Sequence, residues 1–403
     1  MGGFGGELLP GAPQNESKEL GMDFTLAPEQ EEFRKIVHEF AQTVVAPRAE
    51  AMDRAEQLDP DVLDQMAGMG LFGLPFPEEY GGMGADYLTL CLAIEELARV
   101  DSSVAITLEA AVGLGAMPIW RFGTEEQKRR WLPQLAAGEG LAAFGLTEPG
   151  GGSDAGAVRT RAVEDGDQWV IDGTKAFITN AGLPRSVIAT VAAATGTRPD
   201  GRPEVTTIIV PMGTPGFTVG RNYSKVGWHA SDTRELVFEG CRVPVANTLG
   251  ERGGGLANFL RTLEEGRIAV AALATGLCQG CVDECVAYAR EREAFGRPIA
   301  NFQAIAFKIA DMELRAHTAR LAYYHAAAKL VAGQPFSKEA AIAKLYASEA
   351  AVTCAREAVQ VHGGYGFMNE FPVARFYRDA KVLEIGEGTS EVMRILIGRS
   401  LGL

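Results

Sequence analysis

The pattern of hydrophobic and polar residues divides the chain into three zones. Between residues 23 and 140, apolar residues recur at three- and four-residue spacing, as Phe33 and Val37 do, which predicts amphipathic helices. Pro28 in a first turn and Pro47 beyond the apolar run predict where the first helix begins and ends. This part is therefore predicted to be an N-terminal α-helical domain.

Between residues 141 and 252 the helical period gives way to short alternating runs rich in β-branched residues. Residues 169–171 and 205–210 are examples of such runs. Asp165-Gly166 and Asp172-Gly173 predict hairpin turns between them. The pattern predicts a middle antiparallel β domain.

The helical period returns between residues 253 and 403. Breaks at 295–298, 333–335 and 362–366 divide this part into four long helices, which predicts a C-terminal four-helix bundle. The fold class is therefore α+β, and the junction between helical and β domains is a favoured place for a ligand. Residues 1–22 are Gly-rich and polar, and they are predicted to be a disordered tail.

Composition excludes several classes of protein. A formal net charge of −14 argues against a nucleic-acid surface, and no run of apolar residues is long enough to predict a membrane span. Six cysteines without an export signal predict reduced thiols and a cytoplasmic protein. Cys278, Cys281 and Cys285 have two interpretations, an iron–sulfur site or buried packing on one helix, and the missing loop glycines favour packing. The histidines have no metal-ligand spacing, so no metal is expected.

Glu387 is the candidate general base. It lies between Gly386 and Gly388, neither of which has a side chain to restrict the carboxylate. Thr389 and Ser390 offer N-cap hydroxyls to a helix that follows. These residues alone fit both a base that reaches into a cleft and a solvated glutamate in a turn between helices.

A glycine-rich segment at 144–154 is the second candidate site. Three successive glycines allow a backbone to approach a flat or phosphorylated ligand closely, and Thr147 and Ser153 add hydroxyl groups. A glycine-rich turn between strands is the alternative interpretation.

Six motifs occur in an order and spacing that resemble the acyl-CoA dehydrogenase family. They span the chain from about Asp23 to Arg399. The motifs are P-E-E-Y-G-G-x-G at 77–84, G-L-T-E-x-x-G-G-S-D at 145–154, W-x-I-x-G-x-K-x-F-I-T-N at 169–180, R-x-x-F-G-x-P-I with Gln303 at 292–303, Q-V-H-G-G-Y-G at 360–366 and E-G-T-S-E at 387–391.

The resemblance implies an FAD-dependent dehydrogenation of an acyl-CoA to its trans-2-enoyl form, with Glu387 removing the α-proton and hydride passing to the flavin. A buried glutamate with a pKa raised to about 6–7 suits this step better than one near ~4. Some family members carry the base before an arginine that resembles Arg267, but Gly266 stands there in this chain. Glu264 and Glu265 point to other faces of the helix and are not expected to be bases.

The resemblance also assigns binding residues. The residues expected to line the flavin ring and its upper chain are Phe144, Leu146, Thr147, Ser153, Phe177 and Thr179. The residues expected to hold the adenosine diphosphate across a subunit interface are Arg292, Phe295, Gln303, Gln360, Gly363 and Gly364, while Thr389 and Glu391 complete the FAD site. The residues expected to contact substrate are Ser153, Arg267 and Gly388.

The family resemblance further implies a homotetramer that passes electrons to electron transfer flavoprotein. Relatives often have an aromatic residue where this chain has Gly386, so a short or α-branched acyl group is expected. Ile106, Thr107 and Ala110 are candidates for setting the chain length. The alternatives are the same chemistry on an acyl-carrier-protein thioester, an oxidase, and an inactive scaffold of the same fold.

Overall fold

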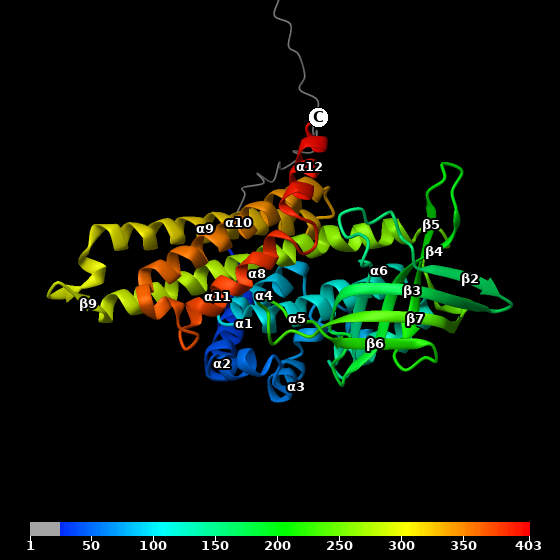
Figure 1. Ribbon diagram of the computed structural model, residues 1–403, viewed down its shortest axis with the longest axis horizontal. Coiled ribbons are helices and arrows are strands. Elements are labelled where there is room, and N and C mark those ends of the chain that lie inside the picture. The colour runs from blue at the N-terminus through cyan, green and yellow to red at the C-terminus, as the bar shows by residue number, and fades with distance from the viewer. Residues whose placement is uncertain (1–24) are drawn as a thin grey trace, which may run out of the picture.

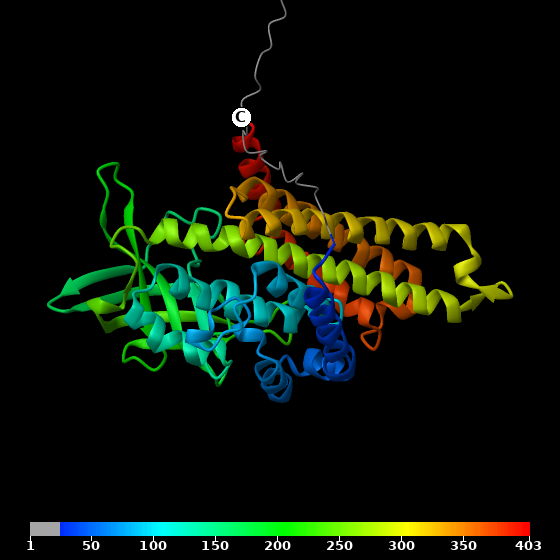
Figure 2. The same cartoon turned by 180° about the vertical axis from the view of Figure 1, so that it is seen from behind.

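The computed structural model describes residues 25–403, which form a helical part, a β part and a second helical part in chain order (Figure 1). The predicted disordered tail at 1–22 lies outside the described residues. The β part lies at one end of an elongated molecule, and the long C-terminal helices extend to the other end (Figures 1 and 2). The predicted α+β class is confirmed.

The first part consists of short helices, of which α1 and α5 pack directly against α4. Aspartates or a threonine cap several of them, for example Asp101, whose carboxylate accepts the N–H groups of Ser103 and Val104 at the start of α5. The helices are α1 Pro28–Phe40, α2 Ala46–Ala55, α3 Pro60–Gly68, α4 Tyr87–Ala98, α5 Ser102–Glu109, α6 Met117–Phe122 and α7 Glu125–Ala136.

The prediction that Pro47 ends the first helix is wrong. A π-helical turn, Ala41–Val45, joins α1 directly to α2, and Pro47 lies in the first turn of α2. Proline is tolerated there because the first N–H groups of a helix have no partner within that helix. A second π-helical turn, Ala110–Ala116, joins α5 to α6.

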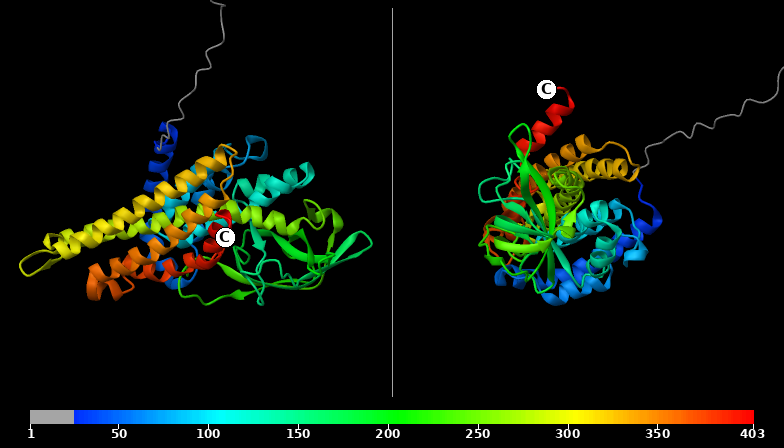
Figure 3. Two further views of the ribbon diagram at one scale, coloured as in Figure 1. Left: turned by 90° about the horizontal axis from the view of Figure 1, so that it is seen from above. Right: turned by 90° about the vertical axis from the view of Figure 1, so that its right-hand side faces the viewer.

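The middle part is one twisted sheet, seen along its strands in Figure 3. Its strand order is β6-β7-β3-β2-β4-β5-β8, with β1 paired to β4. Most pairs are antiparallel, as predicted, but β1 and β2 both run parallel to β4. The strands are β1 Leu141–Gly145, β2 Arg161–Asp165, β3 Gln168–Thr179, β4 Ser186–Thr197, β5 Pro203–Pro211, β6 Phe217–Asn222, β7 Thr233–Pro244 and β8 Thr248–Leu249.

Only one of the two predicted hairpin turns exists. Gly166 has φ +66 in the turn between β2 and β3, as predicted. Gly173 instead lies inside β3, where the register with β7 shifts between Ile171 and Gly173. A Cβ at Gly173 would lie 2.6 Å from the Cα of Thr160, so this glycine permits a bulge rather than a turn.

The last part contains three long helices and two short ones, not four long ones. The sequence breaks at 295–298 and 333–335 separate the long helices as predicted. The region after residue 366 is divided again by a 3₁₀ turn, Lys381–Glu384, and by the loop that holds Glu387. The elements are α8 Gly255–Glu291, β9 Glu293–Ala294, β10 Arg297–Pro298, α9 Gln303–Val331, α10 Ser337–His362, α11 Pro372–Ala380 and α12 Ser390–Ser400.

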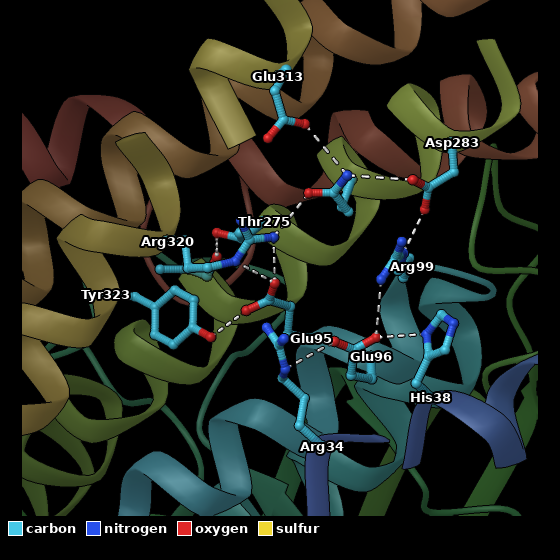
Figure 4. A network of polar contacts seen from close by, with 12 residues as sticks. Arg34, His38, Glu95, Glu96, Arg99, Thr275, Asp283, Glu313, Arg320 and Tyr323 are labelled. Atoms are coloured by element: carbon cyan, nitrogen blue, oxygen red, sulfur yellow. Dashed lines mark hydrogen bonds and ion pairs between the residues drawn. The ribbon is translucent and has the colours of Figure 1, made fainter. Parts of the chain in front are cut away.

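Helices α8, α9, α10 and α11 form the predicted bundle, and α4 packs against α8 so that both helical parts share one apolar core. A polar network crosses this contact (Figure 4). Buried Glu95 on α4 accepts hydrogen bonds from Arg320 Nε at 2.8 Å and from the Tyr323 hydroxyl, both on α9. Arg320 also donates to Gln279 of α8 at 3.0 Å. The network satisfies a carboxylate that would otherwise be costly to bury.

Two stretches are long and apolar enough to cross a membrane by length and composition alone, Ser102–Phe122 and Gly255–Glu291. In this fold, 94% and 83% of their most apolar windows are buried inside the protein. Core helices of globular proteins pass the same test, so the finding is weak evidence for a membrane span.

Candidate active site

Glu387 lies in the tight loop that precedes α12. Its φ is +53, and Gly388 follows with φ +104. Thr389 caps α12 by accepting the N–H of Val392 at 3.3 Å, and Lys344 Nζ on α10 donates to the Gly388 carbonyl at 2.6 Å. The left-handed conformation costs a non-glycine residue roughly 1–2 kcal/mol, so these two hydrogen bonds hold a loop that is locally unfavourable.

Gly266 on α8 leaves the space that the Glu387 carboxyl fills. A Cβ at Gly266 would overlap Glu387 Oε2, and Leu114 Cδ2 would be 3.3 Å away. Glu387 is partly exposed as a residue, but its Oε2 atom is buried and has no hydrogen-bond donor among residues 25–403. Arg267, the next residue of α8, is also buried. A side chain at position 266 would therefore displace the Glu387 carboxyl group from its place in this site.

The surroundings of Glu387 raise the pKa of its carboxyl group to near neutral pH. Burial raises its pKa to about 7, although the neighbouring Glu109 carboxyl group and the positive charges of Lys344 and Arg267 act in the opposite direction. Burial also lowers the pKa of Lys344 to about 8. A carboxyl group with a pKa near the working pH is suited to general-base catalysis.

A buried ion pair fixes the glycine-rich segment on the side of the β domain. Lys175 on β3 is fully buried and donates to the Leu146 carbonyl at 3.1 Å and to Glu148 Oε1 at 2.8 Å. The Glu148 carboxylate also accepts the backbone N–H groups of residues 159–160 at 2.8 and 2.9 Å. Glu148 therefore ties the middle of the segment to β3 and to the chain that enters β2.

The residues predicted to line the flavin ring lie around this segment. The N–H of Ala176 donates to the Thr147 carbonyl at 2.9 Å, which brings the segment beside β3. Phe177 follows with φ +62, and its ring is 64% exposed, 5.3 Å from the ring of Tyr223. An exposed aromatic residue next to the strand position that binds the glycine-rich segment fits a flat heteroaromatic ligand such as a flavin.

The other predicted residues of this group are less uniform. Phe144 on β1 packs its ring against Phe259 of α8, with 4.5 Å between the ring centroids. Leu146 is buried, Thr179 is half-buried at the end of β3, and Ser153 is exposed. Phe144 therefore joins the β domain to α8, while Ser153 is free to contact a ligand.

The residues predicted to hold adenosine diphosphate lie elsewhere. Arg292 ends α8, stacks over the Tyr365 ring at 5.6 Å and precedes Phe295, which is 95% exposed with φ +53. Gln303 begins α9, Gln360 lies in the last turn of α10, and Gly363 and Gly364 follow it with open space around them. The β9–β10 hairpin that links α8 to α9 lies at the end of the molecule opposite the β domain (Figures 1 and 2). A single chain therefore does not bring the two predicted groups together.

Sequence reasoning missed the polar residues that face Glu387. Glu109, Tyr87 and Lys344 are all buried, and none of them belongs to a motif that resembles the family. A usable signal existed, because Glu109 is the one charged residue in the apolar run 104–120. Of the chain-length candidates, Ile106, Thr107 and Ala110 are buried on the same stretch of helix.

The cysteines favoured for packing have that role. Cys278, Cys281 and Cys285 are free thiols buried along α8. No group of three metal-ligating side chains occurs in the part of the chain that the structure describes.

Comparison with known proteins identifies the family. Models of the N-terminal, middle and C-terminal domains of acyl-CoA dehydrogenases match residues 27–139, 143–241 and 253–402. A probable acyl-CoA dehydrogenase of Bacillus subtilis (strain 168) is 48% identical over 380 residues, which cover 94% of this chain and 100% of the relative.

Solved structures agree. Butyryl-CoA dehydrogenase from Megasphaera elsdenii superposes with a TM-score of 0.91 at 44% identity, over 95% of this chain and 100% of that one. A structure described as the electron transferring flavoprotein of Acidaminococcus fermentans also has a TM-score of 0.91 at 44% identity, over 94% and 99% of the two chains. The chain therefore belongs to the acyl-CoA dehydrogenase family, the FAD-dependent oxidoreductases that act on CH–CH bonds of acyl-CoA thioesters.

Proposed function

We propose that Glu387 is the base that removes the α-proton of a short or α-branched acyl-CoA. The observation that carries this proposal is the buried Glu387 carboxyl, whose pKa burial raises to about 7. An α-proton of a thioester is weakly acidic, so a base of ordinary carboxylate strength would be poorly matched to it. General-base catalysis of this kind contributes roughly 10²–10⁴ in rate.

The chain's other residues prepare the thioester for this step. The backbone N–H of Glu387 is the proposed donor to the thioester carbonyl, where negative charge develops as the α-proton leaves. Arg267 and Lys344 supply positive charge close to the base. Gly388 follows the base in the loop and Ser153 is exposed on the β side, and both are proposed to contact the substrate.

FAD supplies the acceptor for the β-hydrogen when it is bound. We propose that Phe144, Leu146, Thr147, Ser153, Phe177 and Thr179 hold its ring, with Thr389 and Glu391 beside the base. Arg292, Phe295, Gln303, Gln360, Gly363 and Gly364 are proposed to hold the adenosine diphosphate of a cofactor bound mainly by a neighbouring subunit. The placement of these two groups at opposite ends of the molecule supports a homotetramer in which FAD sites are shared.

Gly386 supports the choice of substrate class. Among the described residues, the one atom within 4 Å of a Cβ built on Gly386, apart from its chain neighbours, is the Val382 carbonyl oxygen at 3.5 Å, so the space beside this position is open. This leaves room for a branch at the α-carbon of the acyl group. The similar butyryl-CoA dehydrogenase, by its name, acts on a short straight acyl group.

Two further parts of the proposal concern the setting of the reaction. Electron transfer flavoprotein is the proposed electron acceptor, and a structure described by that name superposes on this chain. The proposed location is the cytoplasm, which the six free, buried thiols support. An acyl-carrier-protein thioester is the second candidate substrate, because it presents the same reacting atoms.

The test is anaerobic reduction of the FAD-loaded protein by a panel of acyl-CoAs. Short straight, α-branched and long straight thioesters are each mixed with wild type and with Glu387→Gln, and bleaching of the flavin band is followed. We expect short or α-branched thioesters to bleach wild type, and Glu387→Gln to react at least about 10²-fold more slowly.

Each other outcome has a defined meaning. Preferential reduction by the long straight thioester contradicts the substrate class. Bleaching by none of the acyl-CoAs, but by a matched carrier-protein thioester, supports the second candidate. Reduction of Glu387→Gln at the wild-type rate contradicts the assignment of the base. A protein that takes up no FAD would be the inactive scaffold, and one that reacts readily with oxygen after reduction would be an oxidase.

A further inference from the structure

Glu109 is a fully buried carboxyl group that meets no hydrogen-bond donor on a described residue. It ends α5, where the helix passes into the second π-helical turn. Neither side-chain oxygen meets an N–H or O–H donor, and the polar group within hydrogen-bonding contact is the carboxyl of Glu387. Two buried carboxyl groups in contact require a physical account, because an unpaired buried charge is strongly unfavourable.

Polar side chains from three other helices surround the two carboxyl groups. Tyr87 and Cys91 of α4 face Glu109, and a Cβ built on Gly113 would lie 2.9 Å from Glu109 Oε1 and 3.7 Å from the Tyr87 hydroxyl. Glu265 of α8 adds a carboxylate that acts on Tyr87. The cations are Arg267 of α8 and Lys344 of α10.

These cations decide which carboxyl group keeps a proton. Both Arg267 and Lys344 act on Glu387, and neither acts on Glu109. In a low-dielectric site two carboxylates in contact do not both ionise, so one proton is retained between them. Positive charge on the Glu387 side makes Glu387 the anion and Glu109 the neutral acid. In agreement, burial and then the charge of Glu387 raise the pKa of Glu109 well above its ordinary value.

We propose that protonated Glu109 donates a hydrogen bond to the Glu387 carboxylate and is the positioning residue for this base. The inference rests on the function proposed above, in which Glu387 removes the α-proton. The two glycines beside Glu387 leave its side chain unguided, so a directed hydrogen bond is needed to orient it. The same bond stabilises the ionised form that accepts the proton.

Two substitutions separate this role from simple packing. Glu109→Gln keeps an N–H donor at the position, whereas Glu109→Leu keeps the volume and removes the donor. Without the donor, the pKa of Glu387 rises, and the acidic limb of the pH profile for flavin reduction moves to higher pH. We expect Glu109→Leu to be at least about tenfold slower at about pH 6, since each pKa unit is worth a factor of ten. Glu109→Gln should stay within about threefold of wild type.

A second measurement does not depend on turnover. Infrared spectra taken about two pH units above the pKa of about 7, where Glu387 is ionised, should show a protonated carboxyl band in wild type that is missing in Glu109→Gln. Glu126→Gln on α7, which removes an exposed carboxylate, is the matched control and should change neither the band nor the pH profile.

Three results would overturn the proposal. Glu109→Leu with the wild-type pH profile would show that no donor is needed. Equal shifts of the pH profile in Glu109→Leu and Glu109→Gln would show that Glu109 acts only through packing. A Glu109→Gln protein as inactive as Glu387→Gln would show that Glu109 itself is the base. If wild type shows the carboxyl band but no thioester reduces its flavin, the proposed function is contradicted, whereas the proton held between the two carboxyl groups is still supported. If Glu109→Leu does not fold, the infrared spectrum of Glu109→Gln is the remaining test. A carboxyl band that persists in this variant would contradict the proposal.

Discussion

Two buried glutamates of the N-terminal helices contrast with each other. Glu95 on α4 is enclosed by donors, because Arg320 and Tyr323 both donate to its carboxylate (Figure 4). Glu109 on α5 is equally buried, yet the polar group that it contacts is a second carboxyl, that of Glu387. Both arrangements remove charge from water, but only the first compensates it fully.

The difference indicates which carboxylate belongs to the fold and which to the chemistry. A satisfied carboxylate joins helices and has no capacity left for a ligand. An unsatisfied one keeps a raised pKa and an open lone pair, which are the properties that proton transfer needs. We therefore expect substitutions around Glu95 to change stability, and substitutions around Glu109 and Glu387 to change the reaction.

The largest effect on stability is expected from Glu95→Ala. This change leaves the half-buried Arg320 without its carboxylate, and breaking a buried pair costs about 3–5 kcal/mol in the free energy of unfolding. Urea denaturation of the FAD-loaded protein measures the loss. The double variant Glu95→Met/Arg320→Met should recover most of it, because no charge is then left unpaired. A single variant as stable as wild type would contradict the structural role of Glu95.

Two glycines of α8 allow a sharper form of the same comparison. A Cβ at Gly276 would overlap the Glu95 backbone carbonyl and lie 2.9 Å from Ala98 Cβ, so Gly276→Ala must separate α8 from α4. Such overpacking costs about 1–3 kcal/mol in the free energy of unfolding. Flavin reduction by the best acyl-CoA should be little changed at a temperature where the variant is folded. Full stability in denaturation would show that this helix contact is adaptable.

Gly266→Ala is the counterpart ten residues earlier. Its methyl group would meet the Glu387 carboxyl, which is a flexible side chain rather than backbone. We expect the rate of flavin reduction to fall about tenfold or more, because small misplacement of a catalytic group is costly. The denaturation midpoint should change less than that of Gly276→Ala. If Gly266→Ala and Gly276→Ala lowered stability equally, the distinction between a glycine of the active site and a glycine of the helix contact would be contradicted.

The smallest effect expected is on the pH dependence of stability. Glu387 has a pKa of about 7 in the folded protein, above its ordinary value of 4.5, so the folded state binds this proton more tightly. Its contribution to stability is complete below pH 4.5 and is lost as pH rises through 7. In Glu387→Gln the fall over this window should be smaller by about 1–2 kcal/mol, as urea denaturation across the window would measure. A steeper fall of the free energy of unfolding with rising pH in Glu387→Gln would contradict the predicted direction of this effect.

The sequence predicts the architecture well, since periodicity depends on local burial. The run around Val37 and the strands near Trp169 follow from which side of each element is apolar, and the helix starting at Ser390 follows from the capping hydroxyl before it. The predictions fail where a helix or strand continues through a local departure from regular geometry. A π-helical turn lets the chain continue past Pro47, and a bulge at Gly173 keeps one strand intact where a turn was predicted.

The site was only partly predictable, for a different reason. Glu387 is recognisable because its two glycines and its helix cap are adjacent in sequence. Glu109 lies 278 positions earlier in the chain (387 − 109), and no local pattern records that a π-helical turn and the loop before α12 bring the two carboxyl groups together. Electrostatic contacts between distant segments depend on the packed fold.

The distance between Arg292 at the tip of the bundle and Phe177 in the β domain has a consequence for handling the protein. With each FAD shared between neighbouring chains as proposed, the cofactor is also a link in the assembly, and its retention obeys mass action in the protein itself. Dilution alone would then release flavin and lower specific activity together. Added FAD would restore both, whereas a cofactor held by one chain would be insensitive to protein concentration.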